Sequence, residues 1–216
     1  MTDLRYAVRY FHVVPPVSRL MVISFGVLTT AGGLLTVADG TNASAAVPIL
    51  VLQAFGVSTG FAVLARRGYF DLLVARGLPR VRIAVVQWVL AAMPGLCCWA
   101  VLGATHALNH GGGNPFIQSG TVVAFLMAST IPWAVSVGLP RFSGAIGWLL
   151  VAAQADFGGV IWPDSVHDVI VPVVLLGTDL GHRLEVLTPA VMLSLVSMTL
   201  ALVWVHRSDI RLEAAQ

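Results

Sequence analysis

Long apolar stretches alternate with short polar connections along most of this chain. A helix needs about 20 apolar residues to cross the hydrocarbon core of a bilayer. Stretches of this length lie at residues 20–38, 47–65, 83–106, 119–139, 143–162 and 186–205. The pattern therefore predicts an all-α, polytopic membrane protein with six transmembrane helices. No composition shift divides the chain, so we expect one transmembrane domain over residues 1–216.

The composition agrees with this interpretation. Hydrophobic residues make up 57% of the chain and charged residues only 10%, whereas soluble domains carry about 25% charged residues. All basic residues are arginines, because the sequence contains no lysine. The net charge of +2 is less informative than the positions of these arginines along the chain.

The arginines predict the orientation in the membrane. If the N-terminus is cytoplasmic, eleven of the twelve lie on the cytoplasmic side and only Arg183 lies on the other. Cytoplasmic loops of membrane proteins carry such an excess of positive charge. We therefore expect a multi-pass protein of the cell membrane (an inner or plasma membrane) with both termini in the cytoplasm.

The connection between the last two predicted spans contains a second apolar stretch, Val169–Gly177, which is too short to cross the membrane. This pattern predicts a re-entrant or short-helix hairpin there. Acidic residues and histidines flank it: Asp164, His167, Asp168, Asp179, His182 and Glu185. Their spacing matches no metal-ligand motif, so we expect no metal site.

The predicted second and third spans are joined by the charged segment RRGYFDLLVARGLPRVR. Asp71 falls in the first turn of a helix-compatible run and Arg76 in its last turn, where each charge suits the helix dipole. Gly77 is a plausible residue after the helix end, and Pro79 prevents continuation. The segment therefore predicts a short, capped cytoplasmic helix at about residues 68–78.

One side of this short helix is apolar. Phe70, Leu73 and Val74 share a face by the i, i+3, i+4 rule. An apolar face on a short cytoplasmic helix needs a partner, which is either the membrane surface or a groove on another protein. The residues alone leave both partners open.

The sequence GYFDLLVARGLPR resembles the coupling helix of ABC-2 type transporter permeases. Other features are similar to this family: six predicted spans, two cytoplasmic termini, a basic amphipathic segment (TDLRYAVRYFHVV) before the first span, and a broken apolar hairpin before the last. The resemblance implies a non-catalytic permease subunit of an ATP-driven exporter. It also implies that two copies pair in the bilayer as a homodimer, without nucleic acid.

The same resemblance implies that the short helix contacts a separate ATP-binding subunit, and we expect Phe70, Leu73 and Val74 to pack into a groove on that subunit. The residues that it assigns to this coupling are Gly68, Phe70, Asp71, Leu72, Leu73, Val74, Arg76, Gly77, Pro79 and Arg80. ATP and magnesium would then be bound by the partner, with no cofactor on this chain. The missing lysine agrees, because the Walker A loop needs a lysine to reach the phosphates.

Two polar residues in the fifth predicted span are candidates for a translocation path. Asp156 is the one acidic residue well inside a span, with Gln154 close by, and ionisable residues inside a membrane usually face the bundle interior or a water-filled cavity. A secondary transporter or channel that uses Asp156 is therefore an alternative function. An intramembrane enzyme is another, although the nearest match to a protease nucleophile motif, at 141–144, lacks its first glycine.

Overall fold

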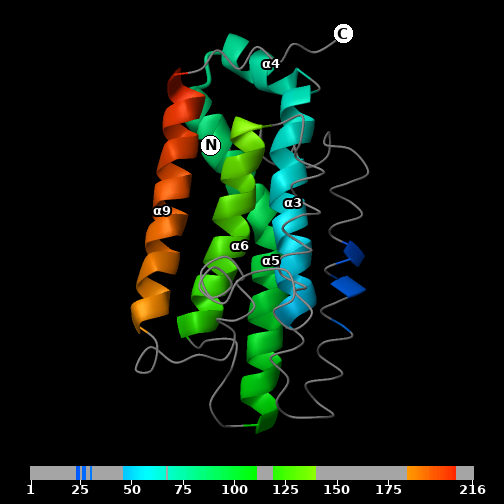
Figure 1. Cartoon of the computed structure of the whole chain (residues 1–216). Helices are drawn as coiled ribbons and strands as arrows, with labels where there is room; N and C mark the ends of the chain where they lie inside the picture. Colours follow the sequence, from blue (N-terminus) through cyan, green and yellow to red (C-terminus); the bar gives the residue numbers. More distant parts are fainter. Residues whose placement is uncertain are drawn as a thin grey trace.

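The computed structural model of the chain describes residues 46–66, 68–110, 119–139 and 184–207, together with residues 23, 24, 26, 27 and 30. The longer ranges form the helices α3 (Ala46–Arg66), α4 (Tyr69–Ala75), α5 (Arg80–His110), α6 (Ser119–Gly138) and α9 (Leu184–Arg207) (Figure 1). No strand occurs in these ranges. The all-α prediction is therefore confirmed for the part of the chain that the structure describes.

Three of these helices are long and apolar enough to cross a membrane, at Arg80–Asn109, Thr121–Gly138 and Leu187–Arg207. They coincide with the third, fourth and sixth predicted spans. The second predicted span forms α3, in which the apolar part Leu52–Val63 is shorter. These helices are those of a membrane protein.

The first and fifth predicted spans lie largely or wholly outside the described residues. Of the first span, at 20–38, only five helical residues are described. The fifth span at 143–162 and the hairpin before the last span lie outside the described residues, as does the amphipathic N-terminal segment. The total of six spans stays a prediction.

The long helices form a bundle in which α3, α6 and α9 run in one direction and α5 runs in the other (Figure 1). The main contacts join α6 to α9 and to α3, and α3 to α5. Burial follows from this arrangement: 61% of the apolar span of α6 is buried, compared with 22% of that of α9. The helix α6 is therefore an inner helix of the described bundle, as is α3, none of whose described side chains is exposed.

The helix α5 extends beyond the predicted span at both ends. Its 31 residues correspond to a length of about 46 Å, whereas the hydrocarbon core of a bilayer is about 30 Å thick. Pro94 lies inside α5 and Pro132 inside α6, and both helices continue through them. Packed membrane helices tolerate proline because their neighbours satisfy the freed backbone groups.

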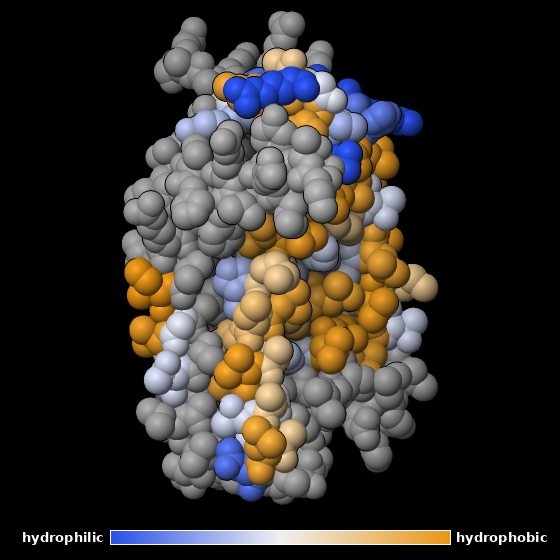
Figure 2. Space-filling model, turned by 180° about the vertical axis from the view of Figure 1, so that it is seen from behind, coloured by the Kyte–Doolittle hydropathy of each residue, from blue (hydrophilic) through white to orange (hydrophobic). Residues whose placement is uncertain are grey.

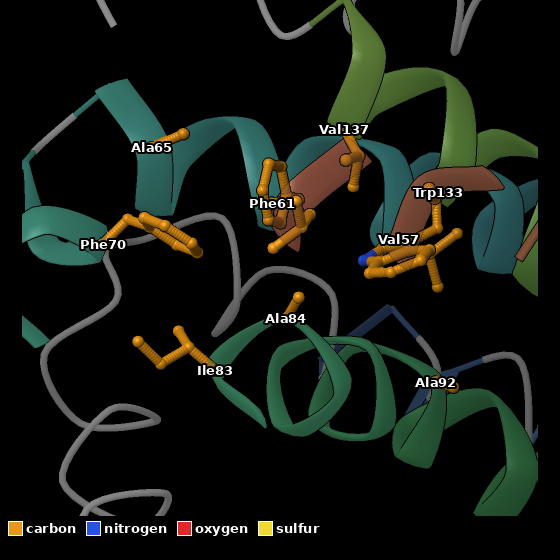
Figure 3. Close-up of a cluster of buried hydrophobic side chains, with 11 residues drawn as sticks. Val57, Phe61, Ala65, Phe70, Ile83, Ala84, Ala92, Trp133 and Val137 are labelled. Atoms are coloured by element: carbon orange, nitrogen blue, oxygen red, sulfur yellow. The ribbon is translucent and has the colours of Figure 1, made fainter. Parts of the chain in front are cut away.

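A hydrophobic cluster at one end of the bundle joins all five helices (Figure 3). Its buried members are Val57, Phe61, Ala65, Phe70, Ile83, Ala84, Ala92, Trp133, Val137, Ala201 and Val205. Phe61 lies in the middle, with its ring edge-on to Phe70 at 6.0 Å and to Trp133 at 6.2 Å between ring centroids. This one side chain thus connects α3 to both α4 and α6.

The hydropathy of the surface changes along the bundle. Figure 2 shows apolar residues along the middle of the helices and hydrophilic residues at the end where α4 lies. The exposed apolar side chains include Val89 and Met93 on α5 and Leu195 and Leu200 on α9. Such a surface is suited to contact with lipid chains, because the bilayer interior offers no water to solvate polar groups.

The central position of Phe61 predicts a large effect of truncation. Phe61→Ala should lower the free energy of unfolding by about 3–5 kcal/mol, because it removes packing on both sides of the ring and leaves a cavity. The matched control is Leu200→Ala, whose side chain is 64% exposed on α9. Thermal unfolding in detergent should show a clear fall in Tm for the first variant and little change for the second. Equal Tm values would contradict a central role of Phe61.

Candidate functional site

The helix α4 begins at a glycine that also ends the preceding helix. Gly68 has φ of +68°, in the left-handed region. Its N–H donates to the carbonyl of Ala65 at 3.1 Å, and its own carbonyl accepts from the N–H of Leu72 at 3.1 Å. Glycine adopts this conformation without the steric cost that a Cβ atom brings. Gly68 therefore sets the sharp turn between α3 and α4.

The other end of α4 closes with a Schellman motif. Gly77 has φ of +83° and donates its N–H to the carbonyl of Val74 at 2.9 Å, while Leu78 donates to the carbonyl of Leu73 at 3.3 Å. These two bonds satisfy carbonyl groups that the helix end would leave unpaired. Leu73 and Leu78 both pack against the hydrophobic cluster. The prediction that Gly77 follows the helix end is confirmed.

The residues after α4 lead directly into α5. The helix ends at Ala75, so Arg76 follows the last turn and does not belong to it, unlike the prediction. The carbonyl of Pro79 accepts from the N–H of Ile83 at 3.1 Å and begins the hydrogen bonding of α5. Arg80 is the first residue of that helix. The proline thus marks the start of α5 as well as the limit of α4.

The apolar face of α4 contacts its own chain. Phe70 is only 2% exposed and belongs to the hydrophobic cluster, while Leu73 and Val74 are half-buried and pack against it. The expectation that these three side chains pack into a groove on another protein is therefore not what the structure shows. The sequence pattern correctly indicated that this face needs a partner, but the ends of α3 and α5 supply it.

The outward face of α4 consists of Asp71, Leu72, Ala75 and Arg76, all of them exposed. Leu72 is a large apolar side chain with 46% of its surface exposed, between an acidic and a basic neighbour. Asp71 lies in the first turn, as predicted. An exposed leucine framed by opposite charges is the feature of this end that best suits a contact with another protein.

The end of the bundle around α4 is positively charged. Arg76, Arg82 and Arg207 are exposed there, and Arg80 is half-buried. They belong to two separate parts of the chain, the segment from the end of α4 into α5 and the end of α9, which lie at the same end of the bundle (Figure 1). This grouping agrees with the predicted excess of arginine on one side of the membrane.

A second set of polar side chains lies inside the bundle, where two neighbouring residues of α5 hold α6. The indole N–H of Trp133 donates to Oε1 of Gln87 at 2.7 Å. The indole N–H of Trp88 donates to the backbone carbonyl of Ser129 at 2.9 Å. One bond thus runs from α6 to α5 and the other from α5 to α6.

The same region includes a glutamine from α3. Gln53 is fully buried and donates from Nε2 to the hydroxyl of Ser129 at 3.2 Å. That hydroxyl donates to the carbonyl of Phe125 at 2.8 Å. Oε1 of Gln53 has no hydrogen-bond partner in the structure. The three helices α3, α5 and α6 are therefore joined by polar contacts as well as by apolar packing.

Gly60 allows Gln87 to approach α3 closely. A Cβ atom at position 60 would lie 2.7 Å from Nε2 of Gln87 and 3.5 Å from the Cβ atom of Ala91. No real pair of atoms of this kind comes so close without a shift. The glutamine that binds Trp133 is therefore packed directly on the backbone of α3.

Sequence reasoning missed this internal set, although a signal was present. Gln53 and Gln87 are the only glutamines in their predicted spans, and polar residues within spans tend to face the bundle interior. The same rule selected Gln154 and Asp156, which lie outside the described residues. The charge of Asp156 makes its span stand out, whereas the neutral carboxamides of Gln53 and Gln87 do not.

Within the described ranges, no group of three or more His, Cys, Asp or Glu side chains is placed to hold a metal ion. Cys97 is exposed and Cys98 is buried. Most of the flanking histidines and acidic residues of the predicted hairpin lie outside these ranges. The described candidate site therefore consists of α4 and the polar contacts inside the bundle.

No protein-family model, curated protein sequence or solved structure gives a significant match to the chain. The function must therefore be argued from the geometry of α4 and of the bundle that supports it.

The two left-handed glycines predict a specific loss of order in α4. Gly68→Ala and Gly77→Ala should each cost about 1–2 kcal/mol, because an L-residue is strained at positive φ. A Cβ atom meets no neighbour within 4 Å at either position, so the strain comes from the backbone alone. Hydrogen exchange of the α4 amides should become faster in both variants.

The matched control for these variants is Gly138→Ala at the end of α6. A Cβ atom there also meets nothing within 4 Å, and Gly138 does not have a positive φ. Exchange in α4 should stay at the wild-type rate in this control. The same rate in all three variants would show that the glycines do not shape α4.

The contact between Gly60 and Gln87 predicts non-additive effects on stability. Gly60→Ala should destabilise the protein, because the new methyl group displaces the carboxamide that binds Trp133. In the Gln87→Ala background the same change should cost less, since the space is free. The coupling should be about 0.5–3 kcal/mol, as for other residues in contact. Thermal unfolding of the wild type, the two single variants and the double variant measures this coupling. Additive costs would contradict the contact between Gly60 and Gln87.

Proposed function

We propose that this chain is the membrane-spanning subunit of an ATP-driven exporter of the ABC-2 type, with α4 as the contact for a separate ATP-binding subunit. The observation that carries this proposal is the construction of α4. Its inner face is anchored in the bundle by Phe70, and its outer face presents Leu72. A helix of seven residues built in this way is suited to transmit movement between two proteins.

The contacts of α4 with the bundle suit a helix that passes movement from one protein to another. The helix touches both α3 and α5, and glycines with left-handed φ bound it at positions 68 and 77. A displacement of α4 would therefore act on both α3 and α5. A loop that only set the membrane topology would require the arginines, but neither the two caps nor the buried phenylalanine.

The outer face has the composition of a protein contact. The core of a protein interface is depleted in charged residues, and charged groups around it help to set orientation. Leu72 would occupy the centre, with Asp71 and Arg76 at its sides and Arg80 nearby. Gly68, Gly77 and Pro79 would shape the helix, and Phe70, Leu73 and Val74 would hold it on the bundle. This assigns the predicted coupling residues to three groups with different tasks.

ATP and magnesium belong to the partner subunit in this proposal, since a chain without lysine lacks a Walker A loop. Pairing with a second copy of the chain, the direction of export and the cytoplasmic position of both termini rest on the resemblance to ABC-2 type permeases. The arginines gathered around α4 support a cytoplasmic position of this end.

The alternatives depend on other residues. A secondary transporter or channel would use Asp156, which lies outside the described residues, and an intramembrane enzyme would need a nucleophile within a span. The buried polar side chains of the described helices include no carboxylate: they are Gln53, Ser58, Gln87, His106, Thr121, Ser129, Thr130, Ser136 and Ser194. The described helices therefore supply no buried acidic group for the transporter alternative.

A pull-down from the native membrane tests the proposal. The tagged chain, extracted in mild detergent, should bring down a stoichiometric partner with a Walker A motif. Leu72→Asp should reduce the recovered partner about tenfold or more, because each factor of ten needs only about 1.4 kcal/mol and the variant places an unpaired charge in the contact. Mass spectrometry of the eluate identifies and quantifies the partner.

The matched control is Leu139→Asp, which adds the same charge at an exposed leucine at the α4 end of the bundle but outside α4. It should retain the partner. Recovery of the chain without any nucleotide-binding protein would contradict the proposal and direct attention to Asp156. Equal loss in both variants would contradict the assignment of the contact to α4.

A further inference from the structure

A continuous row of side chains leads from α4 to the middle of α6. The ring of Phe70 lies edge-on to Phe61 at 6.0 Å, and Phe61 lies edge-on to Trp133 at 6.2 Å. Trp133 then donates its indole N–H to Gln87 at 2.7 Å. Figure 3 shows Phe70, Phe61 and Trp133 one after another within the hydrophobic cluster. Four helices contribute to this row.

The row ends next to Pro132, the residue at which α6 can bend most readily. Pro132 has no N–H, so the carbonyl four residues earlier lacks its usual helical partner, and helices bend most readily at such a residue. Trp88 binds the carbonyl of Ser129 on one side of Pro132, and Gln87 binds Trp133 on the other. Two adjacent residues of α5 thus hold α6 on both sides of its proline.

We propose that Phe70, Phe61, Trp133 and Gln87 form a relay through which displacement of α4 releases α6 to bend at Pro132. The relay rests on the proposed function only in so far as an ATP-binding subunit supplies the displacement. The four side chains are positioning residues, because they act on α6 and touch no transported molecule.

The packing of the row explains why it transmits movement. Phe61 and Trp133 are fully buried and Phe70 is 2% exposed, so the three rings are enclosed by other protein atoms. Protein interiors are close-packed and pass displacements on from one side chain to the next. Gly60 adds a further constraint, because it lets Gln87 lie directly on α3. A shift of α3 therefore moves both the donor and the acceptor of the bond between Trp133 and Gln87.

The result of releasing this bond follows from the position of α6. It is an inner helix of the described bundle, with contacts to both α3 and α9. Bending at Pro132 would separate Ser129 from Gln53 or from Trp88, since these bonds lie just before the proline. The buried polar contacts would then rearrange together, which makes α6 a two-state element that α4 biases.

Fluorine NMR on the full chain in lipid nanodiscs tests the relay without any partner. The tryptophans are replaced by 5-fluorotryptophan, and the Trp133 resonance is assigned from its loss in Trp133→Phe. Phe70→Leu and Phe61→Leu should each shift or broaden this resonance. If Phe61→Leu does not yield folded protein, Phe61→Met replaces it, because the flexible side chain fills most of the space without a ring.

The matched control is Phe125→Leu. Phe125 packs against Trp99 with ring centroids 5.3 Å apart, in the other hydrophobic cluster of the bundle. This variant should shift the Trp99 resonance and leave that of Trp133 in place. It separates the relay from a general response of the bundle to loss of an aromatic ring.

The second part of the experiment adds the co-purified ATP-binding subunit and ATP. In the wild-type chain nucleotide should move the Trp133 resonance. In Phe61→Leu the subunit should still bind through the unchanged outer face of α4, while the Trp133 resonance no longer responds. A merely structural role of Phe61 would leave this response intact in folded protein.

The outcomes separate the two proposals. An unchanged Trp133 resonance in both Phe70→Leu and Phe61→Leu would overturn the relay, whatever partner the chain has. A normal nucleotide response in Phe61→Leu would also overturn it. If both variants shift the resonance in the free chain but no nucleotide-binding protein co-purifies with the chain, the relay is supported and the proposed function is contradicted.

Discussion

The edge-on packing of Phe61 against Phe70 and Trp133 is the contact on which the described structure depends. It fixes the short helix α4 to the bundle through a single side chain of α3. Tyr69, Leu73 and Val74 of α4 add contacts with the same cluster. Aromatic rings are suited to this task because they are large and rigid, and such pairs contribute about 0.5–1.5 kcal/mol beyond the area that they bury.

The membrane imposes a second constraint, which is the pairing of polar groups. Backbone groups inside a bilayer must be satisfied within the protein, and Pro132 disturbs this in α6. The indole of Trp88 and the carboxamide of Gln87 bind α6 on either side of that proline. The helix is thus continuous in the structure and still has a defined place where it can bend, under a cluster that extends to α4.

The sequence predicted much of the described fold and only part of the candidate site. Helices at the second, third, fourth and sixth predicted spans follow from the length of the apolar stretches, and the cap at Gly77 follows from its position before Pro79. Periodicity identified an apolar face around Phe70 but could not show that the chain itself covers it. The internal pairs of Gln87 with Trp133 and of Gln53 with Ser129 join residues far apart in sequence, so no local pattern reveals them.

The sequence by itself determined that the chain is apolar enough for the membrane, where several of its helices lie, and where the arginines group, because hydropathy and charge are properties of each segment alone. The tertiary structure decided which side of α4 is buried and which residue, Leu72, is left for a partner. It also decided that a row of side chains joins α4 to Pro132. These features depend on the packing of four helices around Phe61, and packing is a property of their arrangement in space.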